Sequence, residues 1–441
     1  MRDKNQLAKK KINFYSSLRF YIPKKHTAIM PSYSQDNRQI TFVVATKYHI
    51  IISYVIQNFF PRDYRKYIVI SDVMTDAEDI YKKLVALNTW DKVFLIENKE
   101  LTSTKKFFFA KMSKFLRAKL QIERLIKRNN MQKICVFTHG DYCSRFFSSS
   151  SFPKEIYLGE DGTFPYYGGY EMYDSYKNFE FLPFSIGNIK QEINSLLELI
   201  KKGKSFLLHK LSPSFFVVDH SKRVKAMILL RPDLYNDNFD QQKKDIYKVD
   251  CNSEQINKSF KELSEVFDYV PNEIYDNADV VFFESGIVRE ELNLSTKEQV
   301  KFTLDLLTKF KNKKVIIKLG PYASTFKTNS YKLLSKDMPN IFIDDTNTNI
   351  PWEIIYYNNK DSFKDLIISS YRSTACFSTY LLFGIENDVV VFSKILLNKF
   401  KMPSEDEIYA KLYSQFIDKL KFIYTKKTVF IPSKVSSLDK L

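Results

Sequence analysis

Two adjacent carboxylates, Glu160 and Asp161, follow the apolar run EIYLG and precede Gly162. A carboxylate at the end of a buried strand can act as a general base, because crowding and partial burial raise its pKa toward neutrality. Asp-Gly is also a common turn dipeptide, so a purely structural interpretation competes with the catalytic one. The sequence makes Glu160 and Asp161 alternative candidates for a base and leaves the choice between them open, because the titration of such a pair depends on its geometry.

A second group of polar side chains stands between the early apolar run ITFVVA and the apolar helical segment that follows it. Thr46 and His49 lie at this junction, where backbone N–H groups and side-chain donors can bind an anionic or hydroxylated ligand. With Gly162, they are candidate substrate-binding residues. A structural role is the competing interpretation of a single histidine at such a position.

Two further candidates occur in the second half of the chain. Lys318 ends the run KVIIK and is followed closely by Pro321. At the end of a strand, Lys318 would place a positive charge toward a cleft. The alternative is that it is an ordinary surface lysine. Ser373 and Thr374 belong to the hydroxyl-rich stretch SSYRST after the apolar run DLII. Such residues can open a helix whose N–H groups bind phosphate, although helix capping alone explains them equally well.

All of these residues fall at the ends of apolar runs that alternate with helical patterns. The expected strands cover 40–46, 67–73, 92–98, 132–140, 153–162 and 214–219 in the first half and 278–285, 314–320, 340–345 and 388–393 in the second. Helical patterns cover 48–60, 76–87, 104–128 and 188–203, and Ser295 with Glu298 has the spacing of a capping box before a further helix. The stretch 232–258 is polar and less regular.

This alternation predicts the α/β class, with two facing Rossmann-like domains and a cleft between them. We expect an N-terminal domain over 39–270 on the acceptor side and a C-terminal donor-binding domain over 271–400. A basic leader covers 1–38, and a helical segment and tail cover 401–441. Neither half contains GxGxxG or a Walker loop, which disfavours dinucleotide-dependent and P-loop enzymes.

Composition supports a folded protein with anionic ligands. The 441 residues include 68 Lys and Arg and 51 Asp and Glu, which gives a net charge of +17. A charge of this sign attracts anionic partners. The competing interpretation is compositional drift on a solvated surface. The four cysteines form no CxxC pair and no zinc-type cluster, so we expect reduced thiols and no metal. No uninterrupted apolar stretch suits a signal peptide or a membrane span, which favours a cytoplasmic location.

Taken together, the motifs resemble those of the bacterial sialyltransferases of glycosyltransferase family 52, which make lipooligosaccharide and capsule structures, and more distantly those of bacterial polysialyltransferases. The resemblance extends over roughly residues 40–395. It is carried by TKYHIIIS near the start, by Glu160-Asp161-Gly162 with the tyrosines that follow, by PWEI at 351–354 and by YRSTACF at 371–377.

The resemblance implies a GT-B fold and an inverting, metal-independent transfer of sialic acid from CMP-sialic acid to a hydroxyl of a glycan or glycolipid, with no cofactor. By the same resemblance, Glu160 or Asp161 is the base, and Ser373 and Thr374 bind the donor phosphate. Glu353 binds the ribose, unless it is simply a buried acid at a helix start.

One departure concerns the family's Lys-x-His-Pro element, whose histidine donates to the leaving phosphate. Here the matching residues are Lys318, Leu319, Gly320 and Pro321, so that donor is missing. Either Lys318, Tyr322 or Ser324 replaces it, or the activity is weak or differently directed.

Alternatives remain open at this level. The donor could be another CMP-activated acid such as Kdo, the product could be a polysialic chain, or the protein could be an impaired relative that binds glycan or nucleotide without transfer. The segment 104–128 has nine Lys or Arg interleaved with apolar residues. This pattern suits a helix in peripheral contact with the anionic inner face of the bacterial cytoplasmic membrane. It equally suits a helix that packs on the core and has a solvated basic face. No nucleic-acid-binding signature is present, and the acceptor and oligomeric state are not predicted.

Overall fold

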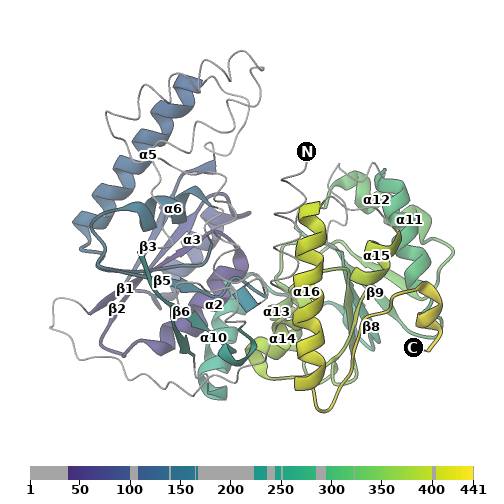
Figure 1. Ribbon diagram of the computed structural model, residues 1–441. Helices are drawn as coiled ribbons and strands as arrows, with labels where there is room; N and C mark the ends of the chain where they lie inside the picture. The colour runs from purple at the N-terminus through teal and green to yellow at the C-terminus, as the bar shows by residue number, and fades with distance from the viewer. Residues whose placement is uncertain are drawn as a thin grey trace, which may run out of the picture.

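A computed structural model describes residues 38–99, 108–138, 141–163, 165–166, 223–235, 244–249, 252–284, 295–321, 323–399 and 404–440. The expected helix at 188–203, the expected strand at 214–219 and nearly all of the basic leader lie outside these ranges. Figure 1 shows two α/β lobes, the first coloured purple to teal and the second green to yellow.

The first lobe is built on a seven-stranded sheet with the order β3-β2-β1-β4-β5-β6-β7. Its strands, all paired in parallel, are β1 Gln39–Val44, β2 Arg65–Ser71, β3 Lys92–Ile96, β4 Lys133–Val136, β5 Glu155–Gly159, β6 Val224–Leu229 and β7 Asp245–Lys248. Its helices include α2 Lys47–Ile56, α3 Ala77–Leu87, α5 Phe108–Arg128 and α6 Tyr142–Ser149. The central strands are continuous apolar runs because helices cover both faces of a parallel sheet.

The second lobe repeats this plan with a six-stranded parallel sheet in the order β10-β9-β8-β11-β12-β13. Its strands are β8 Val280–Phe283, β9 Val315–Lys318, β10 Ile341–Asp344, β11 Ile367–Ser370, β12 Asp388–Val391 and β13 Val429–Phe430. Its helices include α11 Thr296–Leu307, α12 Thr325–Leu334, α13 Trp352–Asn359, α14 Ala375–Phe383, α15 Ser393–Lys399 and α16 Ser404–Ile423. The predicted capping box of Ser295 and Glu298 is confirmed at the start of α11.

The predicted α/β class with two Rossmann-like domains is therefore confirmed. The polar stretch at 232–258 holds more regular structure than expected, since it includes β7 and the start of α10 Ser253–Val266. Helix α10 packs against α2 and α3 of the first domain and against α13 of the second, so it lies where the two domains meet.

The C-terminal segment also connects the two domains. Strand β13 pairs with β12 in the second sheet, whereas α16 contacts the first domain. The ring of Phe416 on α16 stacks on Tyr166 at 6.1 Å between centroids, and Lys419 Nζ donates to the carbonyl of Tyr235 at 3.2 Å. Figure 1 shows α16 along the boundary between the lobes. In the described part of the chain, no helix is long and apolar enough to cross a bilayer.

Candidate active site

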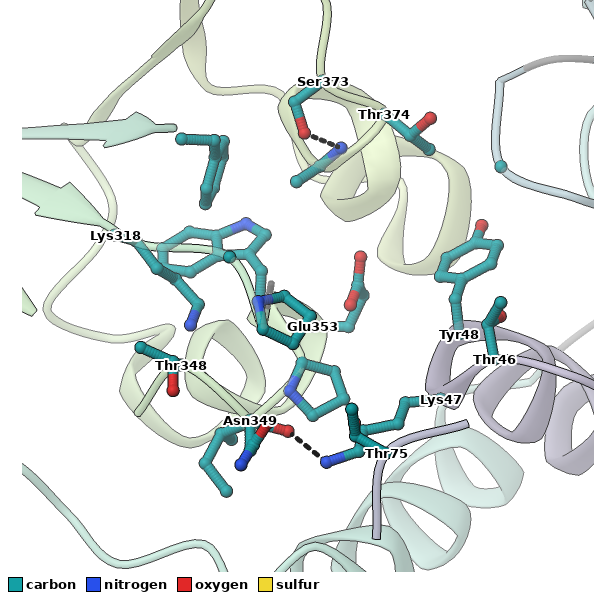
Figure 2. Close-up of a pocket in the computed structure, with 18 of the residues that line it drawn as sticks. Thr46, Lys47, Tyr48, Thr75, Lys318, Thr348, Asn349, Glu353, Ser373 and Thr374 are labelled. Carbon is teal, nitrogen blue, oxygen red and sulfur yellow. Dashed lines mark hydrogen bonds between the residues drawn. The ribbon is translucent and has the colours of Figure 1, made fainter. Parts of the chain in front are cut away.

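A pocket of about 590 Å³ lies between the two domains. Its walls are the segments that follow the carboxyl ends of strands in both sheets, which is where ligands bind in open α/β folds. From the first domain it is lined by Ala45, Thr46, Lys47, Tyr48, Met74, Thr75, Asp161 and Gly162, and from the second by Phe283, Glu284 and the residues at 318–321, 348–353 and 373–375. Figure 2 shows Ser373 and Thr374 at the start of a helix, across the pocket from Lys47 and Thr75.

The pocket brings together most of the candidate residues. Those that line it are Thr46, Asp161, Gly162, Lys318, Pro321, Glu353, Ser373 and Thr374. Two candidates, Glu160 and His49, are buried behind the wall and do not line it.

Asp161 is the carboxylate of the predicted pair that reaches the pocket. Its side chain is 33% exposed, and its Oδ1 lies 3.0 Å from Nε2 of His49. The N–H of Ala45 donates to Nδ1 of His49 at 3.3 Å, so Nδ1 must be unprotonated and Nε2–H is the donor to Asp161. The second carboxylate oxygen of Asp161 is thereby left for a ligand in the pocket.

His49 acts on the pocket through Asp161. Its side chain is 1% exposed, and its ring stacks on Phe137 at 5.0 Å between centroids, with 17° between the planes. The structure places the ring of His49 under the pocket wall, in contact with Asp161, and substrate binding by His49 stays a prediction. Thr46 Oγ1, which does line the pocket, accepts from the N–H of His49 at 3.2 Å and caps α2.

Glu160 is placed differently from its neighbour. Its carboxylate is fully buried and accepts hydrogen bonds from Tyr166 Oη, from the N–H of Leu230 at 3.0 Å and from Tyr48 Oη at 3.2 Å. Burial raises the pKa of Glu160 to about 7, and these hydrogen bonds oppose the rise. A carboxylate enclosed in this way has no path to an acceptor hydroxyl, so the structure argues against Glu160 as the base. It positions Tyr48, which lines the pocket.

The two domains touch directly beside Asp161. Gly162 has φ +59°, and a Cβ on this residue would lie 2.4 Å from Cγ2 of Thr374 in the second domain. The hydroxyls of Thr163 and Thr374 are 3.3 Å apart. The acidic turn therefore packs against the start of α14, and glycine is required at 162 for both conformation and space.

The hydroxyl-rich stretch of the second domain divides into two parts. Ser369 and Ser370 belong to β11 and are buried, so they do not form part of the loop as the sequence suggested. Ser370 Oγ accepts from the N–H of Ser373 at 2.8 Å, and Ser373 Oγ accepts from the N–H of Ala375 at 3.2 Å. This fixes the turn into α14, whose first residues line the pocket. The partial positive charge of a helix N-terminus there favours an anion.

Lys318 and Glu353 place opposite charges on the second domain's wall. Lys318 ends β9, is 6% exposed and donates through Nζ to the carbonyl of Asn347 at 2.7 Å. Its burial lowers the pKa of the ammonium to about 8. Glu353 lies in the first turn of α13, where burial raises its pKa. The described residues hold no cluster of three or more His, Cys, Asp or Glu placed for a metal ion, and metal independence stays a prediction.

Gly320 leaves this wall open. A Cβ there would meet only the carbonyl oxygen of Glu284, at 3.7 Å, which is an ordinary contact. Of the groups predicted to replace a histidine donor, Lys318 lines the pocket, whereas Ser324 caps α12 by accepting from the N–H of Lys327 at 3.2 Å and does not line it. Tyr322 lies outside the described residues.

Lys47 and Trp352 also line the pocket, and the sequence assigns neither of them a role of its own. Lys47 Nζ donates to Asp76 Oδ2 at 3.0 Å and to the carbonyl of Asn349, in the second domain, at 2.8 Å. Both residues fall inside motifs that were recognised, TKYH and PWEI. A lysine is common on surfaces and a tryptophan in cores, so neither carries a signal until the domains are placed together.

No known protein-family model matches the sequence, and no curated protein matches it. Solved structures with a similar arrangement include MurG of Acinetobacter baumannii, 10% identical, with a TM-score of 0.39 over 91% of this chain and 89% of that one. UDP-GlcNAc 2-epimerase from Neisseria meningitidis bound to UDP-GlcNAc is 10% identical, with a TM-score of 0.45 over 91% and 97%. The glycosyltransferase VinC in complex with dTDP is 7% identical, with a TM-score of 0.44 over 91% and 89%.

Proposed function

We propose that this chain is an inverting, metal-independent glycosyltransferase of GT-B type that moves sialic acid from CMP-sialic acid to a hydroxyl of a bacterial surface glycan. The observation that carries the proposal is the meeting of Asp161, from the first domain, with Ser373 and Thr374, from the second, in one pocket. A carboxylate base thus faces a helix N-terminus suited to a phosphate, which is what displacement of a sugar from a nucleotide requires.

In the proposed reaction, the acceptor hydroxyl loses its proton to the free oxygen of Asp161 while its own oxygen forms a bond to the anomeric carbon. The bond from that carbon to the phosphate oxygen breaks, and its electron pair leaves with CMP. Attack on the face opposite the phosphate inverts the configuration. His49 holds the other oxygen of Asp161, so the base meets the acceptor in one orientation.

On the donor side, the start of α14 and its hydroxyls support the phosphate as its negative charge grows. Glu353 is suited to the paired hydroxyls of a ribose, because a carboxylate accepts two hydrogen bonds. Lys318, on the same wall, adds a positive charge.

The test is CMP release from CMP-sialic acid by the full chain, with a glycan acceptor, with and without EDTA. We expect Asp161→Asn to lower the rate by about 10²- to 10⁴-fold and to retain CMP binding. We expect His49→Phe to lower kcat by about tenfold with little change in KM, since an aromatic ring still fills the site while the hydrogen bonds to Asp161 and from the N–H of Ala45 are lost. Release that survives in Asp161→Asn, or that requires a metal, would contradict the proposal.

Gly320 favours a second candidate, a relative that binds a CMP-sugar or glycan without efficient transfer. The loss of one donor at a developing charge costs on the order of 100-fold in rate. Saturable CMP binding with no release from any CMP-activated acid, Kdo and polysialic primers included, would select this candidate. Release of CMP from CMP-Kdo alone would instead mean that CMP-Kdo is the donor and that the type of reaction is as proposed.

Peripheral membrane contact belongs to the same proposal, because acceptors for surface glycans are often membrane-anchored precursors. The described end of α5 exposes Arg117, Arg124, Lys127 and Arg128. Co-sedimentation with vesicles containing anionic lipid, abolished by changing these residues to glutamine and absent with neutral vesicles, would support it.

A further inference from the structure

Lys47 joins the two domains at the wall of the pocket, and Figure 2 shows its bond to Asn349. Its Nζ donates to Oδ2 of Asp76, in the first domain, at 3.0 Å and to the main-chain carbonyl of Asn349, in the second domain, at 2.8 Å. The side chain of Lys47 is 13% exposed, so water competes little for either hydrogen bond. Because an ammonium donates stronger hydrogen bonds than a neutral group does, this contact helps to hold the domains together.

Lys47 and Asp76 both stand where the chemistry of a helix start disfavours them. Lys47 is the first residue of α2, where its positive charge meets the positive end of the helix dipole. Asp76 occupies the N-cap position of α3, but its side chain makes no capping hydrogen bond and its backbone is left-handed, with φ +59°. An aspartate at that position ordinarily accepts from the helix N–H groups. Residues that break local rules in this way are expected at functional positions, and what they gain here is the contact with the second domain.

The loop that accepts the hydrogen bond from Lys47 is tied to its own domain. Residues 345–350 connect β10 with α13, and Asn349 lies in this loop. Lys318 Nζ donates to the carbonyl of Asn347 at 2.7 Å, and Asp344 Oδ1 accepts from the N–H of Asn347 at 3.0 Å. A loop held at these points moves with its domain. The bond to Asn349 therefore fixes the first domain relative to β9, β10 and the start of α13.

A second contact between the domains lies on the opposite side of the pocket. There Gly162 packs against Thr374, and the hydroxyls of Thr163 and Thr374 are 3.3 Å apart. Figure 2 shows Thr374 across the pocket from Lys47. The packing of Gly162 limits how closely the domains approach, because atoms cannot overlap. The hydrogen bond from Lys47 limits how far they separate, so the two contacts together set the width of the pocket.

We propose that Lys47 is an interdomain latch, a side chain that keeps the domains from separating and so positions the donor-binding wall against Asp161. Lys47 is thus a positioning residue, and its role in the reaction rests on the proposed function. The latch itself is argued from the contacts of Lys47 with Asp76 and Asn349. Without it, a ligand that touches both domains binds only the fraction of molecules in which they are together, which lowers its apparent affinity.

The first measurement is the distance between the domains in the ligand-free full chain, by pulsed electron paramagnetic resonance. Spin labels at Glu78→Cys on α3 and Asp305→Cys on α11, both exposed positions, report this distance. Cys251 is changed to serine in this parent chain, because the other three cysteines are buried. We expect one narrow distance distribution for the parent chain and an additional population at longer distance in Lys47→Met.

Lys332→Met is the matched control. Lys332 Nζ donates to Asp345 Oδ2 at 2.6 Å, at the start of the same loop, but both residues belong to the second domain and neither lines the pocket. We expect Lys332→Met to keep the distance distribution of the parent chain. Lys47→Arg, which retains a positive charge and several N–H donors, should restore most of that distribution.

The second measurement is the affinity for CMP, by calorimetry. We expect Lys47→Met to weaken CMP binding by about tenfold and Lys332→Met to leave it unchanged. Asp76→Gly separates a latch from direct contact with the ligand, since it removes the carboxylate that orients Lys47 and tolerates the left-handed backbone. A latch requires longer distances and weaker CMP binding in Asp76→Gly. Direct contact predicts equal or tighter binding, because the ammonium is released toward the phosphate.

Two outcomes would overturn the inference. One is a distance distribution in Lys47→Met that matches the parent chain, and the other is an equal change in Lys332→Met, which would show a general loosening of the loop. Tighter CMP binding in Asp76→Gly with unchanged distances would also contradict a latch and make Lys47 a ligand contact. Longer distances in Lys47→Met, in a chain that does not bind CMP at all, would support the latch and count against the proposed function.

Discussion

Gly162 and Thr374 are in direct contact across the two domains, with Thr374 Cγ2 only 2.4 Å from the position that a Cβ on Gly162 would occupy. This contact limits the separation between Asp161, the residue before Gly162, and the start of α14. Because Gly162 has no Cβ, the proposed base, Asp161, can lie close to the proposed phosphate site at the start of α14.

We predict that Gly162→Ala lowers turnover by at least tenfold, because the new methyl must push Thr374 and α14 away from Asp161. Strain at a positive φ also costs about 1–2 kcal/mol of stability. Gly384→Ala is the matched control, since Gly384 has φ +66° and nothing within 4 Å of its Cβ position. Steady-state rates and urea unfolding of both variants separate the two effects. Equal losses of turnover in Gly162→Ala and Gly384→Ala would show that backbone strain alone matters. Combining Gly162→Ala with Thr374→Ser, which removes Cγ2, should recover part of the rate.

A second prediction concerns stability and pH at Glu160. Burial holds its pKa in the folded protein at about 7, above the ordinary value of 4.5, so between these values the folded state binds more protons than the unfolded state. Stability must therefore fall as the pH rises through this window, by up to about 3 kcal/mol from this group.

Glu160→Gln removes the titration and keeps an acceptor for Tyr48 and Tyr166. We expect its stability relative to the wild type to increase steadily from pH 5 to pH 7.5, as measured by urea unfolding. Glu78→Gln, at a side chain that is 74% exposed, is the control and should show no such trend. A difference that is the same at every pH would mean that Glu160 stays ionised throughout.

Lys318 gives a pH dependence to ligand binding. Its pKa in the folded protein is lowered to about 8 by burial, against the attraction of Asp344 and Glu353 and with the repulsion of Lys47. Only the ammonium attracts a phosphate, and a nucleotide monophosphate is already fully ionised above pH 7, since its second pKa is about 6.

We therefore expect the affinity for CMP to fall by about twofold between pH 7 and 8 and by up to tenfold for each further pH unit. Lys318→Met should bind more weakly at pH 7 and show a flat profile. Calorimetric titrations at pH 7, 8 and 9 measure both. A wild-type profile that stays flat to pH 9 would show that Lys318 keeps its proton or does not contact the phosphate.

Gly320 permits a gain-of-function test. Because its backbone is not in the left-handed region and a Cβ has ordinary space, Gly320→His should fold with a stability within about 1 kcal/mol of the wild type. A histidine at this position adds an N–H donor to the wall that contains Lys318 and Trp352. We expect it to restore at least part of the CMP affinity lost in Lys318→Met, with Gly320→Ala as the control. If the double variant binds CMP no better than Lys318→Met does, position 320 is out of reach of the phosphate.

The strands of both sheets were largely predictable from the sequence, because buried parallel strands are continuous runs such as TFVV and KVII, bounded by polar turns. β6, β7, β11 and β13 were not among the expected strands. The four residues of β7, DIYK, are half-exposed at the sheet edge and lack that pattern. The residues at strand ends were predictable as a group, whereas their roles were not. Glu160 and Asp161 are neighbours with the same chemistry, and only the position of Leu230 and Tyr166 buries one while leaving the other in the pocket.

The contribution of Trp352 could not be predicted for a different reason. A tryptophan beside apolar residues is typical of a core, and Trp352 is indeed packed in one. What distinguishes it is its place on the pocket wall, which depends on where the two domains meet in the folded chain. Contacts between residues hundreds of positions apart, such as Lys47 with Asn349, are set by the docking of two domains and leave no local pattern.

The path of the C-terminal segment has a consequence for how the molecule unfolds. Helix α16 packs on Tyr166 of the first domain, and β13, which follows it, pairs with β12 in the second sheet. Separating the domains would therefore expose apolar surface that the C-terminal segment covers. We expect heat to melt the two lobes in one cooperative transition. A fragment ending before α16 should expose apolar surface on its first domain and aggregate, so a fragment made for expression must retain α16 and β13.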